Sequence, residues 1–124
     1  MNLPSDKHDV ECVERLLKIG YPGLAPVLPA LLEWVKDLNW PVAKPLNEFF
    51  VGVGLPLEAY IRVVLRTDDN CWKRSVLLGI VSHSSKLACA LKQELARIAA
   101  APTSGEQDEE IDLLCVEILE SLAE

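Results

Sequence analysis

The chain of 124 residues is long enough for one domain with a hydrophobic core, and we expect residues 1–124 to form a single domain. Half of the residues are apolar and a quarter are charged, which excludes an intrinsically disordered chain. The net charge of -7 arises in residues 105–124, which hold eight acidic residues and no basic residue. Because a nucleic-acid-binding protein needs a basic stripe, this distribution argues against nucleic acid as a partner.

The sequence shows neither a membrane span nor a disulfide or metal motif. No apolar stretch approaches the roughly 20 residues that cross a bilayer, and no signal-peptide pattern precedes the first predicted helix. The four cysteines, Cys12, Cys71, Cys89 and Cys115, are widely spaced and form no Cys-x-x-Cys motif. We therefore expect a cytoplasmic protein with reduced thiols, no membrane association and no cofactor, whose cysteines act as small apolar residues of the core.

Apolar residues recur at intervals of three and four along almost the whole chain, which predicts an all-α protein. Pro29 and Pro41 fall in first turns, where a missing N–H is tolerated, and Pro45 predicts a kink or a loose turn near the start of the third helix. Residues 102–105 predict a loop before an acidic last helix. The seven predicted helices span about residues 9–18, 26–37, 41–53, 56–66, 71–82, 85–100 and 107–122.

Two segments of the chain match each other at an offset of 32 residues. Asp37 and Trp40 align with Asp69 and Trp72, and apolar residues stand at matching positions on both sides. A repeat of this length with two helices is typical of helical solenoids, in which helix pairs stack because no pair buries its own apolar face. We expect three antiparallel pairs and an N-terminal capping helix, with both tryptophans packed between units.

The turn at residues 37–43, Asp-Leu-Asn-Trp-Pro-Val-Ala, resembles the inter-helix turn of HEAT-like repeats. Over most of its length, the chain is similar to a family of uncharacterised bacterial proteins with a HEAT-like helical fold. This resemblance implies a HEAT-like α-α superhelix, and it implies no function because the family carries no established activity. The residues that carry it are Pro4, the Asp-Lys-His-Asp run at 6–9, Leu32, Trp34, the Asn-Trp-Pro-Val-Ala run at 39–43 and Trp72-Lys73.

No group of residues in the sequence predicts an active site or a metal site. His8 and His83 are the only histidines, and neither has a nucleophile and an orienting partner at a spacing that indicates catalysis. His8 lies among residues that cap a helix, and His83 suits a helix C-terminus. The acidic run from Glu106 to Asp112 lacks the ligand spacing of an EF-hand, so we interpret it as a solvated helix start. We therefore expect a protein that is not an enzyme and binds no metal.

A binding surface is predicted on the second helices of the pairs, which usually line the binding face of such stacks. This surface is polar and runs from basic residues toward the acids of the last helix. Its predicted partner-binding residues are Lys44, Asn47, Glu48, Lys73 and Arg74.

Trp34 is a further candidate for partner binding. Its counterpart at the 32-residue offset is Arg66, and a tryptophan where the other copy carries a charge indicates a partly exposed edge. Exposed tryptophan is a favoured anchor of protein interfaces, whereas packing at the edge of the stack is the competing interpretation.

The leading hypothesis is a non-catalytic protein-binding helical-repeat module that is a monomer or a weak dimer. A regulatory or immunity role is suggested only by analogy with other small acidic bacterial proteins. Two alternatives stay open. One is an enzyme or enzyme subunit with a site in the helical groove, which a deep pocket around one buried acid would favour. The other is a structural oligomerisation domain that pairs through its first or last helix.

Overall fold

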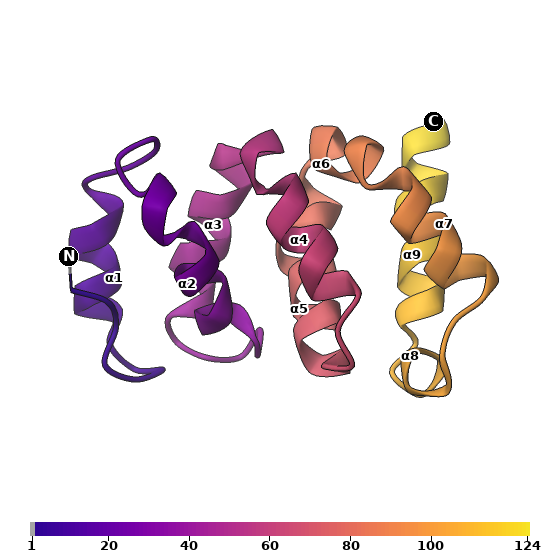
Figure 1. The fold of residues 1–124 in the computed structure, drawn as a ribbon, viewed down its shortest axis with the longest axis horizontal. Coiled ribbons are helices and arrows are strands. Elements are labelled where there is room, and N and C mark those ends of the chain that lie inside the picture. The colour runs from indigo at the N-terminus through magenta and orange to yellow at the C-terminus, as the bar shows by residue number, and fades with distance from the viewer. Residues whose placement is uncertain (1) are drawn as a thin grey trace.

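The computed structural model describes residues 2–124 and contains nine α-helices, four short 3₁₀ turns and, within these residues, no strand. The prediction of an all-α protein is therefore confirmed. The helix pairs follow one another in chain order along the long axis, from α1 (Val10–Leu17) at one end to α9 (Ile111–Ala123) and the helix packed on it at the other (Figure 1). No helix of the described chain is both long and apolar enough to span a membrane.

Most helices lie in pairs across the short dimension of the molecule. In Figure 1, α2 (Leu28–Leu32) lies in front of α3 (Ala43–Val53), and α4 (Glu58–Leu65) lies in front of α5 (Asn70–Gly79). Further along, α7 (Lys92–Ala100) packs against α9. The second helices α3, α5 and α9 therefore share one side of the molecule.

One buried apolar core runs through these pairs. It contains side chains from every α-helix except the short α8 (Ser104–Asp108), whose buried residue is Glu106. Leu46, Ile61 and Leu95, from the third, fourth and sixth predicted helices, are fully buried, so the apolar stripes that predicted these helices face inward. The predicted stripes thus account for the core.

The predicted number of helices was wrong because two predicted helices are each divided. Residues 85–100 form α6 (Ser85–Ala90) and α7, which are separated at Leu91, where φ is -96° and ψ is 10°. Leu87 before the break, Leu91 at the break and Leu95 after it are all buried. Because the apolar face continues through the break, the hydrophobic period did not reveal it.

The predicted loop at residues 102–105 is helical from Ser104 onward. A capping box starts α8: the Thr103 hydroxyl accepts a hydrogen bond from the Glu106 backbone at 3.1 Å, and the Glu106 carboxylate accepts one from the Thr103 backbone at 2.8 Å. Glu110 then adopts a left-handed conformation, with φ of 57°, which separates α8 from α9. The predicted helix 107–122 is therefore two helices that meet at a turn.

Proline shapes the first helix pair. The predicted helix 26–37 contains only α2, flanked by 3₁₀ turns at Ala25–Val27 and Glu33–Val35. The third helix begins at Ala43 and not at Pro41, which places Pro45 in its first turn, where no intrahelical partner is lost. The expected loose start of this helix is seen as the turn that precedes Ala43.

The two aligned turns differ in their hydrogen bonds. The Asp69 carboxylate caps α5 by accepting from the Trp72 backbone at 3.0 Å. The Asp37 carboxylate instead accepts from the Asn39 backbone at 2.8 Å, several residues before α3 begins. The sequence match at these positions therefore gives two related turns and only one helix cap.

The two aligned tryptophans also have different neighbours. The Trp72 indole N–H donates to the Leu32 carbonyl oxygen at 3.1 Å, which joins α5 to the preceding helix pair. Trp40 packs on Trp34 of its own pair, with ring centroids 6.3 Å apart. The prediction of packing between units therefore holds for Trp72, whereas Trp40 packs within its unit.

A second side chain of α5 also reaches the first pair. The Ser75 hydroxyl donates to the Val35 carbonyl oxygen at 2.5 Å, and both residues are buried. The carbonyls of Leu32 and Val35 belong to the last residues of α2 and of the following 3₁₀ turn. Trp72 and Ser75 thus fix α5 against the end of α2.

Replacing Ser75 with alanine is expected to lower the free energy of unfolding by about 1–3 kcal/mol, because the buried Val35 carbonyl then has no donor. Urea denaturation monitored by circular dichroism measures the change. Ser82→Ala is the matched control, because the Ser82 hydroxyl also donates to a backbone carbonyl, that of Leu78, but this hydrogen bond lies at the exposed surface. The control is expected to change stability by at most about 0.5 kcal/mol. Equal losses in both variants would contradict this role of Ser75.

Candidate functional site

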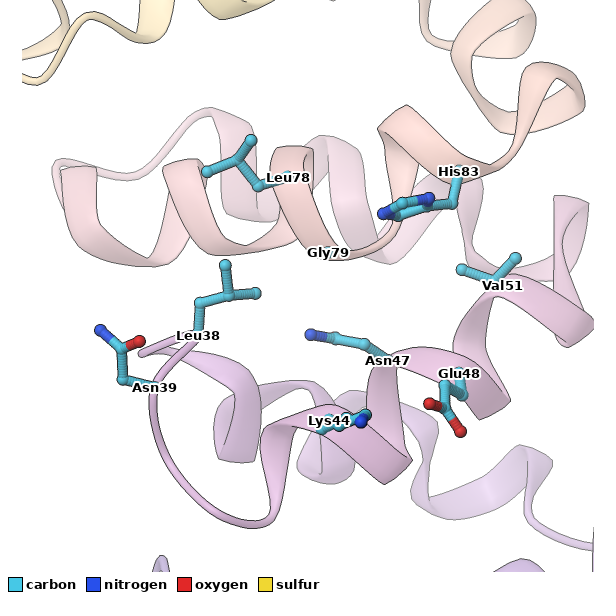
Figure 2. Close-up of a pocket in the computed structure, with 9 residues that line it drawn as sticks. All are labelled: Leu38, Asn39, Lys44, Asn47, Glu48, Val51, Leu78, Gly79 and His83. Carbon is cyan, nitrogen blue, oxygen red and sulfur yellow. The ribbon is translucent and has the colours of Figure 1, made fainter.

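A hollow of about 680 Å³ lies between α3 and α5, and three of the predicted partner-binding residues line it. Lys44, Asn47 and Glu48 come from one side of α3, where a spacing of three and four residues places them on the same helix face. Figure 2 shows Asn47 extending from α3 toward α5, with Lys44 and Glu48 on the α3 side of the hollow. The structure therefore brings these three predicted residues together.

The rest of the lining of the hollow is largely apolar and was not predicted. Leu38, Val51 and Leu78 line it together with His83. Leu38 is 37% exposed. One feature of the sequence indicates this exposure, because Leu38 follows the end of the predicted helix 26–37 and stands next to the turn.

Asn47 is the central polar residue of the hollow and is only 6% exposed. Within residues 2–124, its Oδ1 has no hydrogen-bond partner. Gly79 makes this position possible, because a Cβ atom there would collide with the Asn47 amide. Buried polar groups are almost always paired, so an unpaired amide oxygen in a hollow calls for an explanation.

Lys73 does not lie on the predicted surface, and that prediction was wrong. It is 2% exposed, and its Nζ donates to Glu106 Oε2 at 3.0 Å. The helical period of α5 explains this, since Lys73 stands three and four residues before the buried Val76 and Leu77. Lys73 therefore faces the core and is unavailable to a partner.

Arg74, the next residue of α5, is exposed as predicted and lies near the α3–α5 hollow. It lines a smaller hollow of about 200 Å³ between α5 and α9, together with Glu109, Glu110 and Glu117. Leu78 lines both of these hollows, so they adjoin along α5.

Trp34 lies in a different place. It is partly buried against Trp40 and lines a hollow of about 320 Å³ with Leu3, Ala30 and Lys36. This hollow shares no lining residue with the one between α3 and α5. The structure thus groups three of the six predicted residues, places Arg74 beside them and separates Trp34 and Lys73 from them.

Glu106 is fully buried, so the interpretation of residues 106–112 as a solvated helix start was wrong at this position. Burial would raise the pKa of the Glu106 carboxyl, but the hydrogen bond from the Thr103 backbone and the charges of Lys73 and Arg97 outweigh it and hold the pKa below its ordinary value. The Nη2 atom of Arg97 lies 3.6 Å from Glu106 Oε2. The sequence signal that was missed is the capping-box spacing from Thr103 to Glu106.

The buried Glu106 does not form a catalytic pocket. Both of its carboxylate oxygens are engaged, one by the Thr103 backbone and one by Lys73. The adjoining hollow measures only about 190 Å³. A general base or acid needs a pKa near the working pH, whereas the pKa of Glu106 is moved away from neutrality. This cluster is a buried ion pair that joins α5 to α8.

The cysteines and histidines divide between core and surface. Cys12 and Cys115 are buried, and burial raises the pKa of the Cys115 thiol to about 12. Cys71 and Cys89 are exposed, so their predicted place in the core was wrong. His8 is exposed beside the Asp6 carboxylate, which accepts from its backbone N–H at 2.8 Å. Among residues 2–124, no group of three histidine, cysteine or acidic side chains is placed to hold a metal ion.

The chain belongs to a family described as a domain of unknown function, DUF5071, whose sequence model matches residues 2–119. The expected membership of an uncharacterised domain family is thereby confirmed. No curated protein matches the chain. The family therefore supplies no activity, and the function has to be argued from the geometry described above.

Replacing Glu106 with glutamine is expected to lower the free energy of unfolding by about 1–3 kcal/mol at neutral pH, because the buried ion pair loses its anion. The folded pKa of Glu106 lies below its ordinary value of 4.5, so its contribution is complete above pH 4.5 and is lost as the pH falls through the folded pKa. Urea denaturation between pH 7 and pH 3 should show the wild-type and variant stabilities converging in acid. Glu120→Gln is the control, because Glu120 is exposed. A difference in the free energy of unfolding between the wild type and Glu106→Gln that stays constant at all pH values would contradict the role of the ionised Glu106 carboxylate.

Replacing Asn47 with leucine is expected to raise the free energy of unfolding by about 1 kcal/mol. The substitution removes a buried amide oxygen that lacks a donor and keeps the number and branching of the heavy atoms beside Gly79. The exposed Asn39→Leu in the same hollow is the matched control and should change stability by less than about 0.5 kcal/mol. A clear loss of stability in the Asn47 variant would show that its amide is satisfied in solution.

Proposed function

We propose that this domain is a non-catalytic protein-binding module of the HEAT-like helical-repeat type, which works as a monomer or a weak dimer. Its binding face is the side formed by α3, α5 and α9. The observation that carries the proposal is a set of adjoining hollows on this side, of about 680, 260 and 200 Å³, all of which Leu78 lines.

The arrangement of the helices supports the HEAT-like assignment. Helix pairs follow one another in chain order along the long axis, and two of the units match at an offset of 32 residues. In such stacks each pair contacts mainly its neighbours, and the second helices form one extended surface. The hollows between α3, α5 and α9 lie on that surface.

The chemistry of the α3–α5 hollow is that of a protein interface. Leu38, Val51 and Leu78 provide apolar surface, and Lys44 and Glu48 provide charges of both signs. Interfaces combine an apolar centre with a polar rim, and a contiguous apolar hollow with such a rim is a common site of protein association.

An enzymatic function has less support. Glu106 is the fully buried acid, and its oxygens are occupied by Lys73 and the Thr103 backbone. His83 lines the α3–α5 hollow, but neither a cysteine nor a serine lines that hollow with it. A nucleophile, a base and an orienting group are therefore not assembled there.

The proposal includes a cytoplasmic location. All four cysteines are free, and Cys71 and Cys89 are exposed. Exposed unpaired thiols suit a reducing compartment, because an oxidising one promotes their cross-linking.

The test is affinity capture from an extract of the native host, with the wild-type protein compared with Leu38→Asp and Val63→Asp. Leu38 is 37% exposed in the hollow, whereas Val63 is 66% exposed on α4 and lines none of the hollows on the proposed binding face. We expect the wild-type protein and the Val63 variant to retain one stoichiometric partner that the Leu38 variant loses, because a charge in the apolar wall is costly to bury.

The proposal fails if the same proteins are retained by all three forms, or if no stoichiometric partner is retained by any of them. Circular dichroism of each variant establishes that the loss is not caused by unfolding. Because both substitutions introduce the same charge at an exposed position, net charge is matched between the variant and its control.

A further inference from the structure

Asn47 offers a hydrogen-bonding group that the folded protein does not use. The residue is more than nine-tenths buried, yet its Oδ1 has no partner within residues 2–124. Figure 2 shows its amide group projecting into the hollow, between Leu38 on one side and His83 on the other. A primary amide has both a donor and an acceptor, so it matches the C=O and N–H of a peptide backbone.

The hollow around Asn47 is one of three adjoining hollows, which together are called the channel here. The hollow between α3 and α5 adjoins the hollows beside α9 at Leu78. Next to Asn47 the walls are formed by Leu38, Val51 and Leu78, which suit an apolar side chain. A continuous series of hollows across three helices fits a chain better than a compact molecule.

The charge changes along this channel. At the α3 end, Lys44 and Glu48 balance one another. At the α9 end, Glu109, Glu110 and Glu117 face the single positive charge of Arg74. A ligand that continues past Leu78 toward α9 therefore meets negative charge, which favours a basic group.

We infer that this channel binds an extended, basic peptide segment of the partner protein. An apolar side chain of the segment occupies the hollow lined by Leu38, Val51 and Leu78, and the backbone next to it pairs with the Asn47 amide. A lysine or arginine of the segment lies against Glu109 and Glu117. This inference rests on the proposed function and names the part of the partner that is recognised.

An extended segment fits better than a helix. The backbone groups of a helix are bonded to each other, so a bound helix has no free N–H for the Asn47 oxygen. An extended segment leaves backbone N–H and C=O groups free on both sides. The unpaired amide therefore favours the extended form.

The experiment is a selection of phage-displayed random peptides of about twelve residues on the wild-type protein alone. Synthetic copies of enriched peptides are then measured by fluorescence anisotropy. Asn47→Leu is used because it removes the amide and keeps the number and branching of the side-chain heavy atoms, and Val63→Asp serves as the control variant on α4.

We expect enriched peptides to pair an apolar residue with one or more lysines or arginines on one side of it. Binding should weaken about tenfold in Asn47→Leu and in the double variant Glu109→Lys, Glu117→Lys, and should not change in Val63→Asp. Methylation of one backbone nitrogen beside the apolar residue should weaken binding to the wild-type protein but not to Asn47→Leu, because only the wild type pairs with that nitrogen.

The inference is overturned if no peptide is enriched, if enriched peptides bind Asn47→Leu as tightly as the wild type, or if they carry acidic residues. It is also overturned if every enriched peptide binds as a helix in circular dichroism. A partner retained by wild type and lost by Leu38→Asp, but retained by Asn47→Leu, would leave the proposed function standing and remove this inference alone.

Discussion

The structure depends on carbonyl groups at the ends of short helices that accept hydrogen bonds from the next unit of the chain. Leu32 and Val35 accept from Trp72 and Ser75, forty residues further on. At the next junction, the Leu65 carbonyl at the end of α4 lies 3.5 Å from the Arg97 guanidinium. The short helix α2 ends at Leu32, and the next unit supplies a side-chain donor to the carbonyl of this last residue. The contacts of Trp72 and Ser75 hold α5 against the end of α2 and its following turn.

Much of the fold could be predicted from the sequence, because a 3.6-residue apolar period survives wherever a helix has one buried face. This period located the helices, but it could not detect the break at Leu91, which interrupts the backbone and not the apolar face. Lys73 was predicted at the surface because it is charged, although its position in the helical period of α5 is a buried one. Its partner Glu106 lies 33 residues away, and no local pattern connects the two.

The candidate site was only partly predictable for a related reason. Lys44, Asn47 and Glu48 could be grouped because they share one face of a single helix. Leu38, Leu78 and His83 join them only through the packing of α3 against α5, which depends on contacts between units. Leu78 shows the limit of the repeat: its counterpart Leu46 is fully buried, whereas Leu78 lines the hollows. The units share their helices and differ in what surrounds them.

The direction of these contacts bears on how the protein forms during its synthesis. The donors that complete α2 lie on α5, so a ribosome must add about forty more residues before the ends of α2 and its following turn can be paired. Until then the first pair carries open acceptors and an uncovered apolar side. Each unit therefore completes its hydrogen bonds only after the next unit of the nascent chain has left the ribosome.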